Sequence, residues 1–355
     1  MRKLLNTLFV TKEDAYAALD GENVVIRQGE EVLGRFPLHI LESIYLFSYA
    51  GASPALMGKC AREDVDLVFL SPRGRFLART TGQSRGNVLL RRTQYRAADD
   101  PPQSCRIARN FVFGKVSNAR HVIDRVRRDH GNRVDVERFQ SVSKQLKELL
   151  GQITREQSLD ALRGLEGTAA QLYFSLFDQM ILRNKEAFCF KNRNRRPPMD
   201  RVNAMLSFVY VMLGSDCASA LEMVGLDAYV GFLHRDRPGR TSLAQDLLEE
   251  LRPCIADRFV LTLINEGQVT PKHFEEQESG AVLLNQEGRR VLQREWQAKK
   301  QSVITHPFLK EKVAWGLVPY VQALLLARYL RDDLDVIRRF CGSEGKVCWW
   351  SSPTM

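Results

Sequence analysis

The sequence predicts an α+β protein, in which a small N-terminal antiparallel β domain precedes a larger all-α C-terminal domain. The length of 355 residues favours two domains over one. The first 80 residues contain short β-type runs separated by turn residues, whereas apolar residues recur at helical spacing from about residue 86. We therefore expect domains over 1–85 and 86–341, followed by a loose C-terminal tail over 342–355.

Turn residues divide the N-terminal part into strands. Asp20-Gly21 is a dipeptide typical of tight hairpin turns, and the run Ser71-Pro72-Arg73-Gly74 marks a second turn. Pro54 suits the first turn of a helix, so a short helix is expected from Pro54 to Arg62. The expected strands, in chain order, cover 4–11, 16–19, 24–26, 32–36, 44–47, 67–70 and 76–80.

Capping residues and apolar spacing define the helices that follow. Ser158 can cap a helix, and its core face is a stripe at steps of three and four residues: Leu162, Leu165, Ala169, Leu172, Leu176 and Met180. Asp200 starts a helix through Leu213, and Asp216 starts a second, short one. Ser242 caps a helix to about Ile264, which Pro253 is expected to kink. The other helices are expected at 87–98, in a stretch reaching 129, at 134–150 and within 285–340.

Basic residues are concentrated in the middle of the chain. The net charge is +10, from 52 basic and 42 acidic residues. Residues 51–200 hold 28 basic and 16 acidic residues, whereas residues 201–250 hold 4 and 7. A basic region attracts polyanions, chiefly nucleic acid or an acidic membrane face. The alternative is a solvated basic surface that has no partner.

Cysteine usage and hydropathy predict a cytoplasmic protein without a membrane segment. The seven cysteines include no C-x-x-C pair and are widely spaced, which argues against a disulfide framework or a zinc ribbon. The apolar run after Met1 ends at Lys12, too early for a signal peptide. The apolar stretch from Val313 to Leu330 contains Pro319 and Arg328, so we expect a buried helix there.

Three segments contain residues that could carry chemistry. Glu166 lies beside the apolar stripe of its helix, between two glycines. His234 ends an apolar segment just before a basic loop. Asp246 and Glu249 are three residues apart, so both carboxylates share one helix face. Each segment alone also has a structural explanation: a surface glutamate, a structural histidine, and the acidic first turns of a capped helix.

Taken together, the three segments predict a metal site for phosphodiester chemistry. Carboxylates and one imidazole suit Mg²⁺ or Mn²⁺, and an ion beside a basic surface can polarise a phosphoryl oxygen and activate the attacking group. The arginines that could bind flanking phosphates are Arg195, Arg196, Arg235, Arg237, Arg240 and Arg252. The aromatic residues that could stack on DNA ends, or simply pack in the core, are Tyr95, Phe111, Phe113 and Tyr173.

The chain resembles a known family in three ordered blocks. The blocks are G-L-E-G-T-A-A-Q-L-Y around Glu166, N-R-N-R-R-P-P-M-D-R-V-N-A-M-L-S from Asn192, and G-F-L-H-R-D-R-P-G-R-T-S-L-A-Q-D-L-L-E-E-L-R-P from Gly231. They look like the signature blocks of the CRISPR-associated integrase, the universal adaptation endonuclease that inserts new spacers. The resemblance covers nearly the whole chain. The opening Leu4–Leu8 and the length are similar to the form found in type I systems, subtype C.

The resemblance implies a metal-dependent DNA integrase and nuclease. By motif position, Glu166, His234 and Glu249 would hold Mn²⁺ or Mg²⁺, with Asp246 as a supporting group or a second ligand. The family forms a homodimer, for which the N-terminal domain is the expected contact, and docks onto a small ferredoxin-like adaptation partner. The complex binds a duplex of captured DNA, and its 3′-hydroxyls attack the phosphodiesters at the ends of a CRISPR repeat.

Two other functions remain open at this point. One is a nuclease acting on branched DNA, with the same metal and residues and with water as the nucleophile. The other is a non-catalytic DNA-binding scaffold, in which the basic region binds DNA and the acidic residues are structural. The scaffold predicts steep salt dependence and no metal requirement, so function retained in a chelator would favour it.

Overall fold

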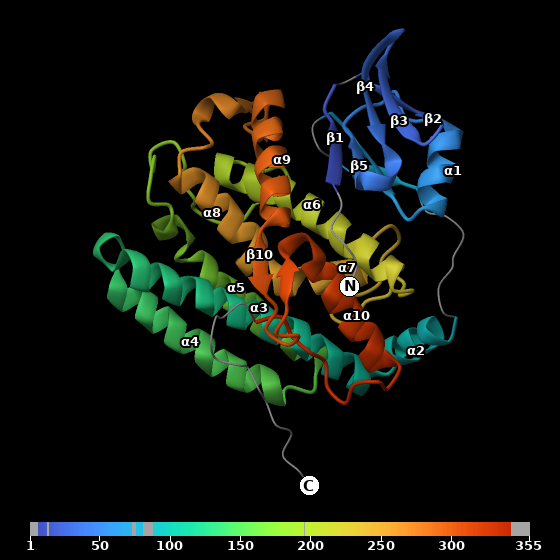
Figure 1. Cartoon of the computed structure of the whole chain (residues 1–355). Coiled ribbons are helices and arrows are strands. Elements are labelled where there is room, and N and C mark those ends of the chain that lie inside the picture. The colour runs from blue at the N-terminus through green and yellow to red at the C-terminus, as the bar shows by residue number, and fades with distance from the viewer. Residues whose placement is uncertain (1–5, 13, 73–75, 81–87, 195, 342–355) are drawn as a thin grey trace.

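The computed structural model describes residues 6–12, 14–72, 76–80, 88–194 and 196–341, and it confirms the predicted fold class (Figure 1). The strands are β1 (Asn6–Val10), β2 (Tyr16–Asp20), β3 (Asn23–Gln28), β4 (Glu31–Pro37), β5 (Leu41–Leu46), β6 (Asp66–Leu70), β7 (Phe76–Arg79), β8 (Phe274–Glu276), β9 (Val282–Leu284), β10 (Val303–Thr305) and β11 (Lys312–Ala314). The helices are α1 (Pro54–Arg62), α2 (Val88–Asp99), α3 (Pro101–His130), α4 (Val136–Arg155), α5 (Leu159–Phe174), α6 (Arg201–Met223), α7 (Ser242–Leu251), α8 (Arg258–Asn265), α9 (Gln286–Gln301) and α10 (Val318–Leu330).

The N-terminal strands form two sheets. β2, β3 and β4 pair antiparallel, as predicted, and Gly21 in the first hairpin turn has a φ of 58°, which favours glycine. β1, β5, β6 and β7 form the second sheet in this order. Leu56 of α1 packs in one apolar cluster with Val24, Ile44 and Leu67, so the helix and both sheets share a core.

The second sheet departs from the expected antiparallel pairing. β1 pairs with β5, and β5 with β6, in parallel, whereas β7 adds antiparallel to β6. The chain between β5 and β6 contains α1, and parallel neighbours need such a crossover connection. The helix predicted from Pro54 to Arg62 was therefore a signal in the sequence for parallel pairing of β5 with β6.

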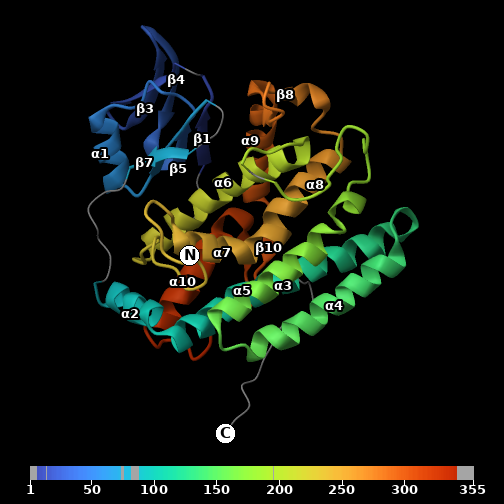
Figure 2. The same cartoon turned by 180° about the vertical axis from the view of Figure 1, so that it is seen from behind.

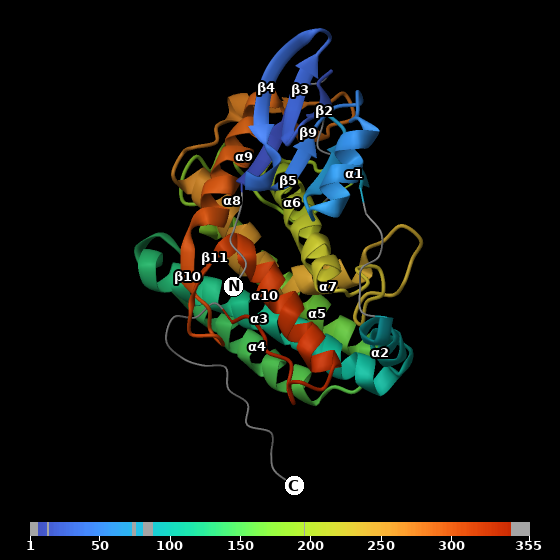
Figure 3. The ribbon, with the colours of Figure 1, turned by 45° about the vertical axis from the view of Figure 1, so that its right-hand side comes forward.

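α3 runs through the helical part and is its central element. α4, α5 and α7 all pack against α3, as Figures 1 and 2 show from opposite sides. Ser158 caps α5 by accepting from the backbone N–H of Ala161, which confirms the predicted cap. In Figure 3, α6 extends from the β sheets toward α7. Helices distant in sequence therefore meet at the middle of α3.

α6 is one continuous helix, where two were predicted with a break before Asp216. Asp216 is not a cap but a partner for groups outside the helix. Lys300 Nζ lies 3.3 Å from Asp216 Oδ1, and the hydroxyl of Tyr45 donates to the same oxygen at 3.2 Å. Asp216 is of a residue type that can cap a helix, but its carboxylate instead contacts Lys300 and Tyr45, which are distant in sequence.

The helix predicted from Ser242 to Ile264 is interrupted near Pro253, as expected. α7 ends at Leu251, and Arg252–Asp257 form a π-helical turn before α8. Proline lacks an N–H and disturbs the α-helical ladder. Ser242 is not the cap: it is the first residue of α7, the side chain of the preceding Thr241 makes no capping hydrogen bond, and the Ser242 hydroxyl donates to the carbonyl oxygen of Arg235 at 3.3 Å.

Buried ion pairs join the β sheets to α6. Arg79 of β7 lies 2.8 Å from Glu222 and 3.3 Å from Asp66. The hydroxyl of Ser219 also donates to Asp66. Because removing one member would leave another charge buried without a partner, this network fixes the sheets on the helical part.

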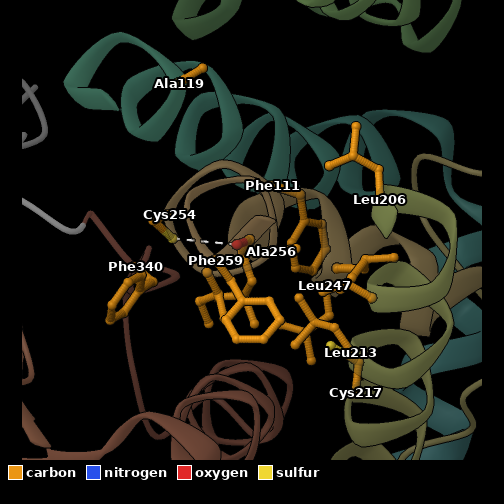
Figure 4. Close-up of a cluster of buried hydrophobic side chains, with 14 of the residues drawn as sticks. Phe111, Ala119, Leu206, Leu213, Cys217, Leu247, Cys254, Ala256, Phe259 and Phe340 are labelled. Carbon is orange, nitrogen blue, oxygen red and sulfur yellow. Dashed lines mark hydrogen bonds between the residues drawn. The ribbon is translucent and has the colours of Figure 1, made fainter. Parts of the chain in front are cut away.

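The main apolar cluster lies between α3, α6 and α7 (Figure 4). Ala119 of α3, Leu213 of α6 and Leu247 of α7 lie in it. Phe111 and Tyr173, two of the aromatic residues considered for stacking on DNA, are each 3% exposed and belong to the same cluster. Core packing, the alternative for these aromatic residues, therefore applies to both.

Among the described residues, one helix has the length and hydropathy to span a membrane. It is α6, and 78% of its most apolar window is buried inside the protein. Within the apolar stretch from Val313 to Leu330, α10 is a largely buried helix, as predicted, whereas Val313 lies in β11 and Trp315–Leu317 form a 3₁₀ turn. The predicted boundary at residue 85 and the predicted tail over 342–355 lie outside the described residues.

Candidate functional site

Three separate segments carry the predicted site residues. Glu166 lies on α5, His234 in the loop before α7, and Asp246 and Glu249 on α7. Both helices pack against α3, and the three helices lie together at the centre of Figure 2. The fold therefore brings the segments to one place, next to a fourth group on α3.

Lys115 of α3 joins the two glutamates. Its Nζ contacts Oε1 of Glu166 and lies 2.6 Å from Oε2 of Glu249. Nη1 of Arg252 lies 2.9 Å from Oε1 of Glu249. The side chains of Lys115 and Glu249 are only 12% and 5% exposed. Two cations and two carboxylates thus form a mostly buried cluster.

Each charged group of this cluster favours the charged form of its partners. Burial alone would raise the pKa of Glu249, but Arg252 and then Lys115 outweigh it and hold that pKa below its ordinary value. Burial would lower the pKa of Lys115, but Glu249 and Glu166 outweigh it and raise that pKa. Glu249 is therefore a carboxylate at neutral pH, the form that binds metal ions.

Asp246 is fully buried and holds His234 in place. Its Oδ1 lies 2.6 Å from Nδ1 of His234 and accepts from the backbone N–H of His234 at 3.1 Å. Its Oδ2 accepts from the backbone N–H groups of Phe232 and Leu233, at 2.7 and 2.9 Å. Because a carboxylate can only accept, Nδ1 carries a hydrogen. Nε2 makes no hydrogen bond to any described residue, which is the arrangement of a histidine oriented for metal binding.

Gly231 lets the His234 loop approach α7. A Cβ at this position would lie 2.9 Å from the carbonyl carbon of Ser242 and 3.0 Å from Oδ2 of Asp246. By contrast, outside the neighbouring residues and local backbone of α5, no described protein atom lies within 4 Å of a Cβ at Gly164 or Gly167, the glycines that flank Glu166. Gly231 is therefore required by packing, whereas the two glycines of α5 border open space.

A pocket of about 520 Å³ lies beside the Lys115 cluster. Lys115, Glu166 and Arg252 form part of its lining, and the further cations Lys191 and Arg193 form another part. The pocket also reaches Tyr173, Tyr210 and Asp257. The wall of the space next to the glutamates therefore includes four cations and three aromatic rings.

The arginines predicted to bind phosphate have different surroundings. Arg252 is mostly buried between Glu249 and the ring of Tyr210, 4.8 Å from the ring centre. Arg235 is exposed and lies 2.9 Å from Asp160. Arg196 and Arg237 are exposed and Arg240 is half-buried, while Arg195 lies outside the described residues. Of those described, Arg252 is the one that borders the glutamates.

The donor types suit a divalent cation. The described His, Cys, Asp and Glu side chains do not form a ready-made group of three ligands. The ammonium of Lys115, however, is a cation that already stands between Glu166 and Glu249. An ion in its place would meet two carboxylate ligands, and Nε2 of His234 could supply a third, a set that suits Mg²⁺ or Mn²⁺.

Sequence reasoning did not identify Lys115. Its carboxylate partners lie on other helices, far along the chain, so no local motif includes it. A signal was nevertheless present: Phe111, Val112 and Ala119 form a buried face of α3, and Lys115 lies on that same face. A lysine among apolar helix positions predicts a buried counter-ion.

Comparison with known proteins identifies the family. The family model of the CRISPR-associated protein Cas1 matches residues 8–298. A "CRISPR-associated endonuclease Cas1 1" of Chlorobaculum tepidum is 46% identical over 340 residues, covering 96% of this chain and 99% of its own. A "CRISPR-associated endonuclease Cas1 2" of Rhodospirillum rubrum is 47% identical over 340 residues, covering 94% and 98%.

Solved structures share the fold. A casposase bound to an integration product superposes with a TM-score of 0.83 at 24% identity, covering 98% of this chain and 96% of its own. A Cas1 protein from Thermotoga maritima has a TM-score of 0.78 at 20% identity, covering 95% and 99%. The sequence match over most of the chain, joined to this common architecture, shows that the chain belongs to the CRISPR-associated protein Cas1 family.

Proposed function

We propose that this chain inserts fragments of foreign DNA into a CRISPR array, by attack of a donor 3′-hydroxyl on a repeat phosphodiester. Glu166, His234 and Glu249 would hold the required Mn²⁺ or Mg²⁺. The observation that carries this proposal is the convergence of two glutamates on one ammonium, next to a carboxylate-held histidine. The names of relatives at 46–47% identity, CRISPR-associated endonucleases, support it, as does the integration product bound to the casposase.

The chain's own residues would prepare the site. Asp246 keeps the hydrogen of His234 on Nδ1, which leaves the lone pair of Nε2 for a ligand. All four hydrogen bonds to Asp246 point back to the His234 loop, so we assign it a supporting role and not that of a ligand. Arg252 holds one oxygen of Glu249 and fixes the orientation of its carboxylate. When bound, a divalent ion would polarise the phosphoryl oxygen and lower the pKa of the attacking hydroxyl.

The DNA would enter over the pocket and the open side of α5. Lys191 and Arg193 line the pocket and can contact phosphates. Gly164 and Gly167 leave room for close approach to the backbone beside Glu166. Exposed Arg196 and Arg237 would bind phosphates further out. Such contacts would grip two duplexes without reading their bases.

We further propose that two copies pair through their β sheets and dock onto a small ferredoxin-like partner. Apolar side chains exposed on this part support pairing, among them Val32 at 52% and Phe76 at 46%. A neighbour of similar fold is a Cas6-RT-Cas1–Cas2 complex, with a TM-score of 0.79 at 21% identity. V32D with F76D should shift the protein from dimer to monomer in light scattering; an unchanged mass would contradict β-sheet pairing.

A joining assay tests the proposed reaction. The substrates are a donor duplex with a free 3′-hydroxyl and a plasmid that contains a CRISPR repeat. Wild type should yield joined product with Mn²⁺ and none in a chelator, whereas E166Q and H234A should yield none. E148Q, an exposed glutamate on α4, is the matched control and should join normally.

A donor that ends in a 3′-dideoxynucleotide separates the reaction types. Joining must stop with this donor, because the nucleophile is missing. Cleavage of branched DNA without any joining would instead favour a nuclease that uses water. Joining by E166Q and H234A at the wild-type rate would exclude this site.

A further inference from the structure

The cluster around Lys115 contains as many cations as carboxylates. Lys115 and Arg252 face Glu166 and Glu249. The side chains of Glu166 and Arg252 are 25% and 16% exposed, so water reaches the cluster only in part. A divalent ion added to this balanced set would leave two positive charges in excess, where water screens them poorly.

Lys115 stands where an ion shared by the two glutamates would need to bind. An ammonium and a divalent ion repel each other strongly at such short range, so Lys115 must leave at least one carboxylate when an ion enters. Phe111, Val112 and Ala119 anchor this part of α3 in the core. The movement is therefore confined to the flexible four-carbon stem of the lysine.

The pocket beside the cluster gives the displaced ammonium a place to go. Lys115 itself lines this pocket, together with Lys191, Arg193 and Arg252. The carboxyl groups of this lining are those of Glu166 and Asp257, against four cations, so an ammonium turned toward the cations would be repelled unless a further anion occupied the pocket. A DNA phosphate is such an anion, and it also offsets part of the charge that the ion adds.

We propose that Lys115 is a positioning residue that couples metal binding to DNA binding. It closes the metal site in the DNA-free protein, and it turns to a DNA phosphate when an ion takes its place. This inference rests on the proposed function, because it requires that Glu166 and Glu249 bind the ion. By thermodynamic linkage, DNA and the ion then raise each other's affinity by the same factor.

Mn²⁺ binding tests the coupling without any reaction. Free Mn²⁺ is measured by electron paramagnetic resonance with the full chain, alone and with a short duplex ending in 3′-dideoxynucleotides. Wild type should bind Mn²⁺ about tenfold more tightly with the duplex. K115M should bind Mn²⁺ about tenfold more tightly than wild type without DNA, and the duplex should add little. K191M alters another lysine of the pocket, and its DNA-free affinity should equal that of wild type.

Two further variants keep the proposal open to refutation. K115R retains the charge and should keep the weak DNA-free affinity; K115R behaving like K115M would overturn the proposal. If K115M is unstable because Glu166 loses its cation and Glu249 keeps only Arg252, Mn²⁺ should raise its unfolding temperature more than that of wild type. Equal or weaker DNA-free binding by K115M overturns the coupling. E249Q binding Mn²⁺ as tightly as wild type would instead refute the proposed metal site.

Discussion

Helix α7 buries two neighbouring glutamates in opposite surroundings. On one side, Glu249 faces Lys115 of α3 and Arg252, and its pKa lies below the ordinary value. On the other side, Glu250 faces Gly114 of α3, where a Cβ would come within 2.8 Å of Glu250 Cγ. Burial raises the pKa of Glu250 to about 8. Of two adjacent residues of α3, Lys115 thus places a cation beside Glu249, whereas Gly114 places no side chain beside Glu250.

The comparison teaches that burial alone does not decide the charge of a carboxyl group. Glu250 is satisfied by neutral donors, since its Oε1 accepts from the backbone N–H of Phe340 and from Nε2 of Gln322 at 3.0 Å. These donors do not offset the loss of water, so Glu250 holds its proton at neutral pH. Glu249 is kept ionised by two cations. Of the two, Glu249 is therefore the one in the ionised form, which is the form that binds metal ions.

DNA joining should show the largest difference between a variant of Glu249 and a variant of Glu250. E249Q removes a charge that the proposed metal site needs, and joining should fall by about a thousandfold. E250Q replaces a neutral acid by a neutral amide of the same shape, and joining should stay near wild type. The joining assay with Mn²⁺ measures both variants. Equal losses in E249Q and E250Q would contradict the assigned difference in charge.

A smaller effect, on metal affinity, is expected from replacing Asp246, the carboxylate that holds His234. D246N would lose the acceptor that fixes Nδ1 of His234 and would face backbone N–H groups with its own amide. Metal affinity should fall about 10- to 100-fold, as for other groups that orient a metal-binding histidine. Mn²⁺ titration measures this loss. Unchanged affinity in a folded D246N would show that His234 is not a ligand.

A loss of folding stability is expected when a methyl group is added at Gly231. G231A places a Cβ against the backbone of Ser242, and such overpacking costs about 1–3 kcal/mol. G164A makes the same change where no described atom lies near, so it should cost nothing and can gain up to about 1 kcal/mol of helix propensity. Urea unfolding measures both. A G231A protein as stable as wild type would mean that the loop rearranges freely.

A pH dependence of stability is expected from Glu250. The folded pKa of about 8 lies above the unfolded value of 4.5, so between these values the folded chain keeps a proton that the unfolded chain has released. Stability therefore falls as pH rises through this window, by roughly 1 kcal/mol per pH unit. E250Q should lose this contribution, which urea unfolding at pH 5, 6 and 7 would reveal. Parallel curves for wild type and E250Q would contradict it.

Local patterns predicted much of this molecule. Asp20-Gly21 and Ser158 act through neighbours a few residues away, and both were placed correctly. The ordered blocks singled out Glu166, His234 and Glu249, whose role as metal ligands stays a prediction. The parallel pairing of β1, β5 and β6 was missed because strand pairing was inferred from the turn residues alone. The predicted helix α1 was not used as evidence for a crossover connection between parallel strands.

Long-range partners set the limit of prediction. Asp216 was taken as a cap because Lys300, its partner, lies far along the chain. Lys115 belongs to no local sequence motif, although its ammonium contacts both glutamates of the proposed site. Glu250 cannot be told from Glu249 by sequence, since its proton depends on Phe340 and on the absence of a side chain at Gly114.

The most direct test is to locate the ion. Crystals of the protein with donor DNA and Mn²⁺ would be measured at the manganese absorption edge, where anomalous scattering marks the metal. We predict one peak within bonding distance of the carboxylates of Glu166 and Glu249 and of Nε2 of His234, with Lys115 moved away from the peak. A peak elsewhere, with Lys115 still bridging the two glutamates, would contradict the account.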